Sequence, residues 1–176
     1  GGAAGLSAAL VLGRARRKTL LVDAGEQSNR PDEGVGGLLG NDAQRDDSGN
    51  VTEEANIDIF SLKVGDCMPY TEDVGEMSDA DVVPCSEPHA DEVFYEFSVP
   101  DGEMPSEEQF QAAVEEKCLP AYNDYVGMDY NESALDLWWI TPTQETWDKA
   151  DDRIVQCVLF DPADNELTGS LEGAAR

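Results

Sequence analysis

The single histidine of the chain lies close to two other residues whose side chains bind metals or carry out nucleophilic chemistry. His89 follows Cys85 by four residues and precedes Glu92 by three. This spacing suits a thiolate, an imidazole and a carboxylate around one metal ion, or a Cys–His nucleophile pair. The alternative is a structural histidine that fixes the turn at Pro88 by hydrogen bonding. We favour the structural histidine, because the chemistry would require a free Cys85 thiol.

The cysteines favour disulfides over a metal centre. None of the four forms a Cys-x-x-Cys pair, and with one histidine a tetrahedral zinc site would need an unusual ligand set. An even number of cysteines in an acidic, lysine-poor stretch is typical of a disulfide framework. Three pairings are possible. We favour Cys67 with Cys85 and Cys118 with Cys157, because the second bond would attach the main helix to the strongest strand.

Several carboxylates also occupy positions where catalysis or calcium binding needs to be considered. Asp66 and Asp152 suit turn capping, or an ion pair with Arg153 in the second case, better than general acid–base catalysis. Residues 46–50 begin like an EF-hand loop but are followed by Val51, where that motif needs glycine. We therefore predict neither catalytic residues nor a metal site.

The elements that must position these residues are those of an α+β domain with a mainly antiparallel sheet. Ser106 and Gln109 form a capping box at the start of the main helix, and Pro120 is expected to force a new helix start. A short capped helix begins at Thr143. Residues 153–160 form the strongest strand pattern, and residues 167–171 are expected to return antiparallel to it. Further strand patterns cover residues 60–64, 93–99 and 135–140.

Charge divides the chain and excludes two classes of partner. The 176 residues contain 11 Lys and Arg against 38 Asp and Glu, a net charge of −27, which excludes binding to nucleic acid or to anionic lipid. Residues 1–40 carry +1 and residues 41–176 carry −28. We therefore expect an N-terminal fragment (1–40), an acidic linker (41–56) and a domain (57–176). No basic-then-apolar leader opens the sequence, and no apolar run reaches the ~18 residues of a membrane span.

The N-terminal fragment carries part of a dinucleotide-binding pattern. Glycines precede an apolar helix and a strand that ends at Asp23, as in a βαβ unit. The stretch resembles the N-terminus of thioredoxin-reductase-like FAD-dependent oxidoreductases, which implies FAD contacts from Gly2, Gly5 and Asp23. The first strand, the first glycine and a redox Cys-x-x-Cys pair are missing from the pattern. We therefore expect a helix–strand remnant without cofactor, and keep a flavin-dependent oxidoreductase as the alternative function.

The acidic part resembles the septum formation-related domain of actinobacterial envelope proteins. The resemblance rests on residues 64–67, 83–89, 152–153 and 168–171, and all four cysteines fall on the pattern of that family. It implies a location outside the cytoplasm, and disulfides at Cys67, Cys85, Cys118 and Cys157. It also implies structural roles for Asp66, Pro88, His89, Glu92, Trp147 and Arg153.

Two adjacent tryptophans offer a contact surface. Trp138 and Trp139 point to opposite faces of a strand, so an exposed ring would mark a face for a partner or for glycan stacking. With no complete catalytic set in the sequence, we predict a non-enzymatic interaction module of the cell envelope or septum. Its partner would be an envelope protein or a glycan.

Overall fold

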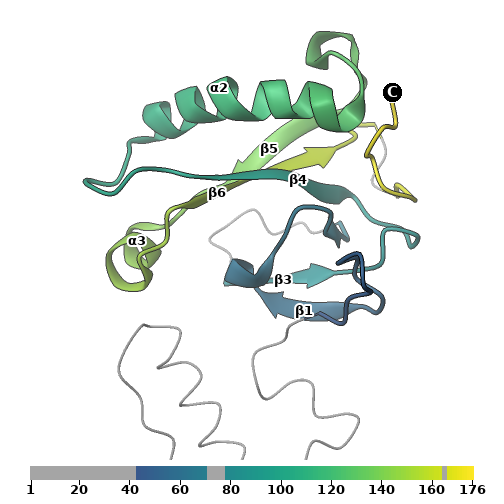
Figure 1. Ribbon diagram of the computed structural model, residues 1–176, viewed down its shortest axis with the longest axis horizontal. Coiled ribbons are helices and arrows are strands. Elements are labelled where there is room, and N and C mark those ends of the chain that lie inside the picture. The colour runs from purple at the N-terminus through teal and green to yellow at the C-terminus, as the bar shows by residue number, and fades with distance from the viewer. Residues whose placement is uncertain (1–42, 71–77, 164–165) are drawn as a thin grey trace, which may run out of the picture.

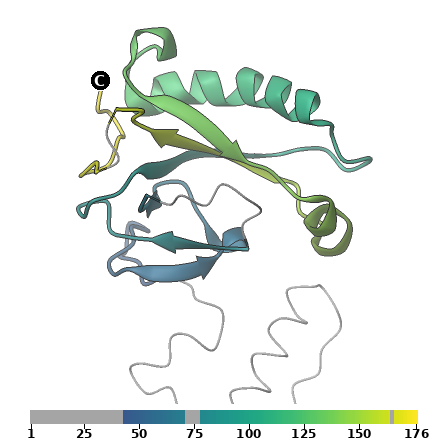
Figure 2. The ribbon, with the colours of Figure 1, turned by 180° about the vertical axis from the view of Figure 1, so that it is seen from behind.

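The protein is built in three layers around a four-stranded antiparallel sheet (Figure 1). The computed structural model describes residues 43–70, 78–163 and 166–176. Strand order in the sheet is β2-β4-β6-β5, with helix α2 on one face and the two-stranded β1–β3 sheet on the other (Figures 1 and 2). The elements are β1 (Ala55–Asp58), η2 (Ile59–Ser61), β2 (Cys67–Met68), β3 (Asp79–Val82), β4 (Asp91–Ser98), α2 (Glu107–Val126), η3 (Tyr130–Glu132), β5 (Asp136–Ile140), α3 (Gln144–Ala150) and β6 (Ile154–Phe160).

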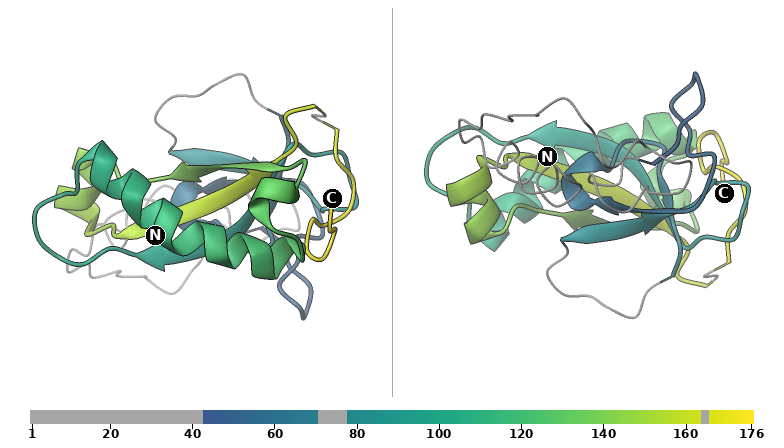
Figure 3. Two further views of the ribbon diagram at one scale, coloured as in Figure 1. Left: turned by 90° about the horizontal axis from the view of Figure 1, so that it is seen from above. Right: turned by 90° about the horizontal axis from the view of Figure 1, so that it is seen from below.

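This architecture confirms the predicted α+β class, with one long helix, a short helix and two disulfides. Seen from above and below, α2 runs obliquely over β6 (Figure 3). The predicted strand at residues 60–64 is wrong, because η2 occupies residues 59–61 and the strand lies before it, at β1. The segment from residue 167 does not pair with β6. Leu167 forms a bridge with His89 instead: His89 N lies 2.9 Å from Leu167 O, and Leu167 N lies 2.7 Å from His89 O.

Helix α2 presents one buried seam to the sheet. Its buried side chains recur every four residues, so they lie on one side of the helix. Pro120 lies inside α2 and does not start a new helix, contrary to the sequence prediction. A proline there removes one backbone hydrogen bond, but burial of the seam on both sides of it keeps the two halves on the same sheet face. The seam consists of Phe110, Val114, Cys118, Tyr122 and Val126.

The other face of the sheet is covered by β1 and β3. Ile57 and Val82 are fully buried there against Val93 of β4 and Val158 of β6. Residues 43–56, assigned to an acidic linker from the sequence, also contribute: Ala43 and Val51 belong to this hydrophobic cluster. An antiparallel bridge joins Arg45 and Val51. The domain therefore begins before residue 57, because apolar residues in this polar stretch pack into the hydrophobic cluster on the β1–β3 side of the sheet.

The capping box at the start of α2 gives a first prediction. The Ser106 hydroxyl accepts from Gln109 N at 3.4 Å, and Gln109 Oε1 accepts from Ser106 N at 2.9 Å. Ser106→Ala should lower the free energy of unfolding by about 1 kcal/mol, because it leaves a helical N–H without its side-chain acceptor. Urea denaturation measures this loss. Ser98→Ala, on an exposed position of β4, serves as control, and an equal loss in both variants would contradict the capping role.

Candidate functional site

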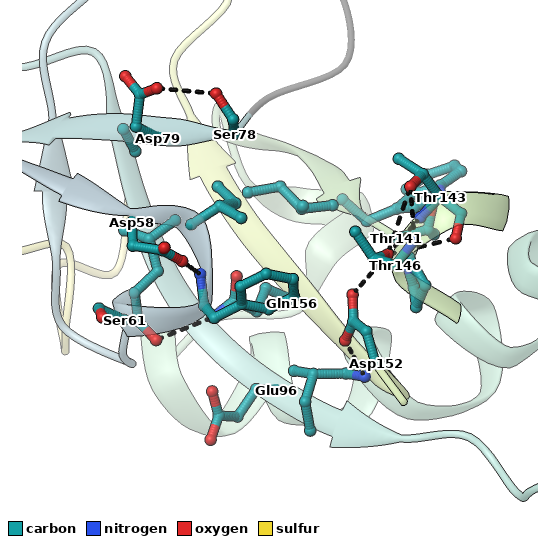
Figure 4. A pocket seen from close by; sticks show the side chains of 18 of the residues that line it. Asp58, Ser61, Ser78, Asp79, Glu96, Thr141, Thr143, Thr146, Asp152 and Gln156 are labelled. Atoms are coloured by element: carbon teal, nitrogen blue, oxygen red, sulfur yellow. Dashed lines mark hydrogen bonds between the residues drawn. The ribbon is translucent and has the colours of Figure 1, made fainter. Parts of the chain in front are cut away.

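An open cleft of about 2950 Å³ lies on the sheet face opposite α2. We call it the sheet cleft. Among the described residues, β1 and β3 lie over only one end of that face, so the β4 segment around Glu96 and the start of β6 line the cleft. Asp58 and Ser61 line one side, and Thr143 and Asp152, near α3, line the other (Figure 4).

The sheet cleft is strongly acidic. Of the described residues, nine acidic and three basic ones line it, and two of the three basic residues are already paired. Lys149 bonds Glu145 at 2.8 Å, while Arg153 lies 3.1 Å from both Asp101 and Asp151. The remaining carboxylates give the cleft a negative field that attracts cationic groups. The acidic residues are Asp58, Asp79, Asp81, Asp91, Glu96, Asp101, Glu145, Asp151 and Asp152.

Hydrogen bonds hold several of these carboxylates in place. The Asn56 amide donates to Asp79 at 3.0 Å and to Asp81 at 2.8 Å, across the β1–β3 pair. The Asn56 bond holds the pKa of Asp79 below its usual value. Burial raises the pKa of Asp91, and the hydrogen bond from Trp138 Nε1 at 2.7 Å opposes that shift. The cleft therefore presents acceptors that hydrogen bonds hold in place on β3 and β4.

Apolar side chains lie among these charges. Phe60 and Ile154 line the cleft and are 54% and 40% exposed, and Tyr70 is 57% exposed. Trp138 packs on the β1–β3 side of the sheet, whereas Trp139 packs on the α2 side, as expected for neighbours on a strand. Both tryptophans are half-buried, so each is partly core and partly available surface. Exposed aromatic and aliphatic groups beside carboxylates suit an amphipathic ligand.

Two residues singled out from the sequence support the α3 wall of the cleft: Arg153 lines it, and Trp147 is buried behind it. Trp147 is 4% exposed, and its Nε1 donates to the Gly102 carbonyl at 3.2 Å. The Arg153 guanidinium stacks 3.7 Å from the centre of the Trp147 ring and donates to the Trp147 carbonyl. Asp151 ends α3 in a left-handed conformation, with a φ of 57°. Trp147 and Arg153 therefore fix the end of α3 against the loop that precedes α2.

Asp66 lies away from the cleft in a buried ion pair. Its carboxylate accepts from Arg45 Nη2 at 2.8 Å and from the Lys63 backbone N–H at 2.9 Å, and it is fully buried. This pair attaches the segment around residue 45 to the loop before β2. Arg45 Nη1 also donates to Oδ1 of Asp66, so both carboxylate oxygens are used in structural hydrogen bonds.

The cysteines, His89 and Glu92 form a second, buried cluster. Disulfides join Cys67 to Cys85 and Cys118 to Cys157, with Cα–Cα distances of 5.3 and 6.3 Å, which confirms the predicted pairing. The sulfur beside His89 and Glu92 is that of Cys67. Possible ligand atoms of these three residues lie within 4.8 Å of one another. The spacing in the sequence pointed to Cys85, because it could not show that β2 pairs with the start of β4.

Of the remaining predicted positions, one is described by the structure and three are not. Pro88 is exposed in the turn before β4. Gly2, Gly5 and Asp23 lie outside the described residues, so FAD binding stays a prediction. None of the described helices is long and apolar enough to cross a bilayer.

Sequence reasoning did not find the sheet cleft. Its walls come from residues 56–70, 78–104 and 138–162, and none of these segments carries a recognisable motif for it. The described lining contains no cysteine or histidine and offers carboxylates, hydroxyls, amides, three basic groups and apolar side chains. That set suits binding.

Comparison with known proteins identifies one family. The model of a family described as Septum formation matches residues 64–176, which include both disulfides, the buried cluster and most of the cleft. No curated protein and no solved structure matches. The matched span is more than half of the chain.

Proposed function

Because the chain belongs to the Septum formation family, we propose that it is an extracytoplasmic, non-enzymatic interaction module of the cell envelope at the septum. The two disulfides are consistent with this location, since such bonds persist in oxidising compartments. The observation that carries the proposal is the sheet cleft, which joins a negative field to exposed apolar side chains.

The partner that fits this cleft is a basic, amphipathic protein segment. Nine carboxylates against three basic groups favour cationic side chains, and Phe60 and Ile154 offer contacts for apolar side chains between them. An acidic glycan would meet repulsion from Glu96 and from Asp58 and Asp79 on the opposite wall. A protein segment therefore suits the charges better than an anionic envelope polymer.

A binding experiment on the full chain tests this function. The probe is a fluorescein-labelled peptide of alternating lysine and leucine, measured by fluorescence anisotropy at low and high salt. We expect saturable binding that weakens as salt rises, because the attraction is screened. A peptide of alternating glutamate and leucine should not bind. Saturable binding of soluble peptidoglycan fragments, with none of the lysine–leucine peptide, would overturn the proposed partner.

A charge reversal locates the binding face. Glu96 is exposed on β4 inside the sheet cleft, and Glu116 is exposed on α2, on the other side of the sheet. Glu96→Lys should weaken lysine–leucine peptide binding about fivefold, because one attraction becomes a repulsion. Glu116→Lys changes the net charge equally and is the matched control. Equal weakening by both variants would indicate nonspecific attraction to an acidic protein, and would contradict the cleft as the site.

A further inference from the structure

The buried cluster at Cys67, His89 and Glu92 has the composition of a metal site. Cys67 and Glu92 are fully buried, and His89 is 1% exposed. The β2–β4 pairing sets Cys67 opposite Glu92, and the bridge between His89 and Leu167 holds the histidine just before β4. Their sulfur, nitrogen and oxygen atoms lie within 4.8 Å of one another, against the about 3.5 Å that separates ligands around tetrahedral zinc.

The histidine is already arranged as a ligand. His89 Nδ1 lies 2.9 Å from the Glu87 carbonyl oxygen, which only accepts, so Nδ1 carries the proton. In the neutral ring Nε2 then holds the lone pair, and it is buried without a hydrogen-bond partner among the described residues. A backbone carbonyl that fixes the tautomer while the other nitrogen stays open is the usual arrangement behind metal-binding histidines.

The carboxylate is oriented in the same way. Glu92 Oε1 accepts from Tyr125 at 2.7 Å and from Ser170 at 2.6 Å, and Oε2 accepts from the Leu171 N–H at 2.6 Å. Each carboxylate oxygen has two acceptor positions, so Oε2 keeps one of them open. Three donors thus hold Glu92 in place and leave one lone pair for a cation.

The missing ligands are the two sulfurs of the neighbouring disulfide. Cys67 Sγ is bonded to Cys85 Sγ, and a disulfide sulfur does not act as a thiolate ligand. We propose that reduction of the Cys67–Cys85 disulfide creates a zinc site formed by both thiolates, His89 Nε2 and Glu92 Oε2. Two sulfurs, one nitrogen and one oxygen complete the four ligands of tetrahedral zinc. The site goes beyond the binding role of the cleft and does not depend on it.

The reductant is a dithiol. Its thiolate attacks Cys85 Sγ, the Cys67–Cys85 bond breaks, and Cys67 leaves as a thiolate. The second thiol of the reductant attacks the mixed disulfide, releases Cys85 as a thiolate and leaves as its own disulfide. Two electrons pass to the protein. When Zn²⁺ captures both thiolates, the two thiol protons of the reductant are released to solvent.

Exposure makes this reduction selective. Cys85 is half-buried and open to attack from solvent, whereas Cys118 and Cys157 are both fully buried. The Cys67–Cys85 bond should therefore open first, and the Cys118–Cys157 bond continues to join α2 to the sheet. Mild treatment with dithiothreitol, followed by alkylation and peptide mapping, should label Cys67 and Cys85 alone. Labelling of all four cysteines at the same rate would overturn the proposed selectivity.

Cobalt reports the site directly. The full chain is reduced, dithiothreitol is removed by anaerobic gel filtration, and Co²⁺ is titrated. We expect one Co²⁺ per chain with a thiolate-to-cobalt charge-transfer band, and no such band for the oxidised protein. His89→Asn keeps a donor for the Glu87 carbonyl but deletes Nε2, so it should weaken Co²⁺ binding about a hundredfold or more. Absence of the band in the wild type, or equal affinity in the variant, would overturn the site.

A measurement without any variant guards against a folding defect in His89→Asn. The chain has one histidine, so a long-range ¹H–¹⁵N spectrum contains one imidazole. The reduced, metal-free protein should show a protonated Nδ1 and a bare Nε2, and one equivalent of Zn²⁺ should shift Nε2 selectively. A proton on Nε2, or an Nε2 resonance that zinc does not move, would overturn the proposal.

Discussion

Glu92→Ala should lower the free energy of unfolding by about 3 to 5 kcal/mol. The Glu92 carboxylate is fully buried and accepts from Tyr125 on α2 and from Ser170 and Leu171 in the C-terminal segment. Removing it leaves three donors without an acceptor in a space that the side chain filled. Burial, together with the Glu92 charge, raises the pKa of Tyr125, so that hydroxyl remains a donor at neutral pH.

Two control variants separate the hydrogen bonds of Glu92 from its other properties. Glu92→Gln keeps the volume but replaces one acceptor oxygen with an amide that donates, so it should lose an intermediate amount, about 1 to 3 kcal/mol. Glu96→Ala changes an exposed carboxylate on the same strand and should stay within about 0.5 kcal/mol of the wild type. Urea denaturation gives all three values. Similar stabilities for Glu92→Ala and Glu96→Ala would contradict the anchoring role of Glu92.

Local sequence patterns predicted the elements that depend on interactions between residues only a few positions apart. Phe110, Val114 and Cys118 recur at helical spacing, and Ser106 starts the helix with side-chain groups that act only three residues away. The pairing of Cys118 with Cys157 was predictable as well, because one cysteine lies on the helix and the other in the strongest strand. For the helix and its cap, the pattern and the final contact depend on the same short stretch, whereas the disulfide joins two such stretches that are 39 residues apart.

The features that the sequence did not predict depend on long-range pairing. In β4 the register shifts between Val93 and Tyr95, so Val93 packs on the β1–β3 side while Tyr95 and Phe97 pack on the α2 side. Simple alternation over residues 93–99 places all three on one face. The extra residue, Phe94, is accommodated as a bulge and packs against the buried seam of α2.

The candidate sites show the same limit. Which cysteine lies beside His89 depends on the β2–β4 pairing, and the sheet cleft depends on where the β1–β3 layer ends. Both are consequences of the chain arrangement and not of spacing along the sequence. A binding face assembled from such segments therefore becomes visible only once the sheet is formed.

Replacing the core disulfide should have the other large effect. Cys118 on α2 and Cys157 on β6 are both fully buried, and the bond closes a loop with a sequence separation of 39 residues. A loop of that length restricts the unfolded chain by about 4 kcal/mol, so Cys118→Ala/Cys157→Ala should lose about that much in urea denaturation. This is a large part of the about 5 to 15 kcal/mol of an ordinary domain.

Hydrogen exchange distinguishes this bond from the other disulfide. β6 is a central strand, paired with both β4 and β5, and the Cys118–Cys157 bond is the covalent link between it and α2. Without the bond, α2 is held only by side-chain packing and by hydrogen bonds such as that of Tyr125 to Glu92, so its amides should lose protection before those of β4 and β6 do. The Cys67–Cys85 bond closes a shorter loop, with a separation of 18 residues. Its removal in Cys67→Ala/Cys85→Ala should therefore cost about 3 kcal/mol of unfolding free energy and leave α2 protected. If the two double variants expose α2 equally, or if Cys118→Ala/Cys157→Ala stays within about 1 kcal/mol of the wild type, packing and not the sulfur bridge fixes the helix to the sheet.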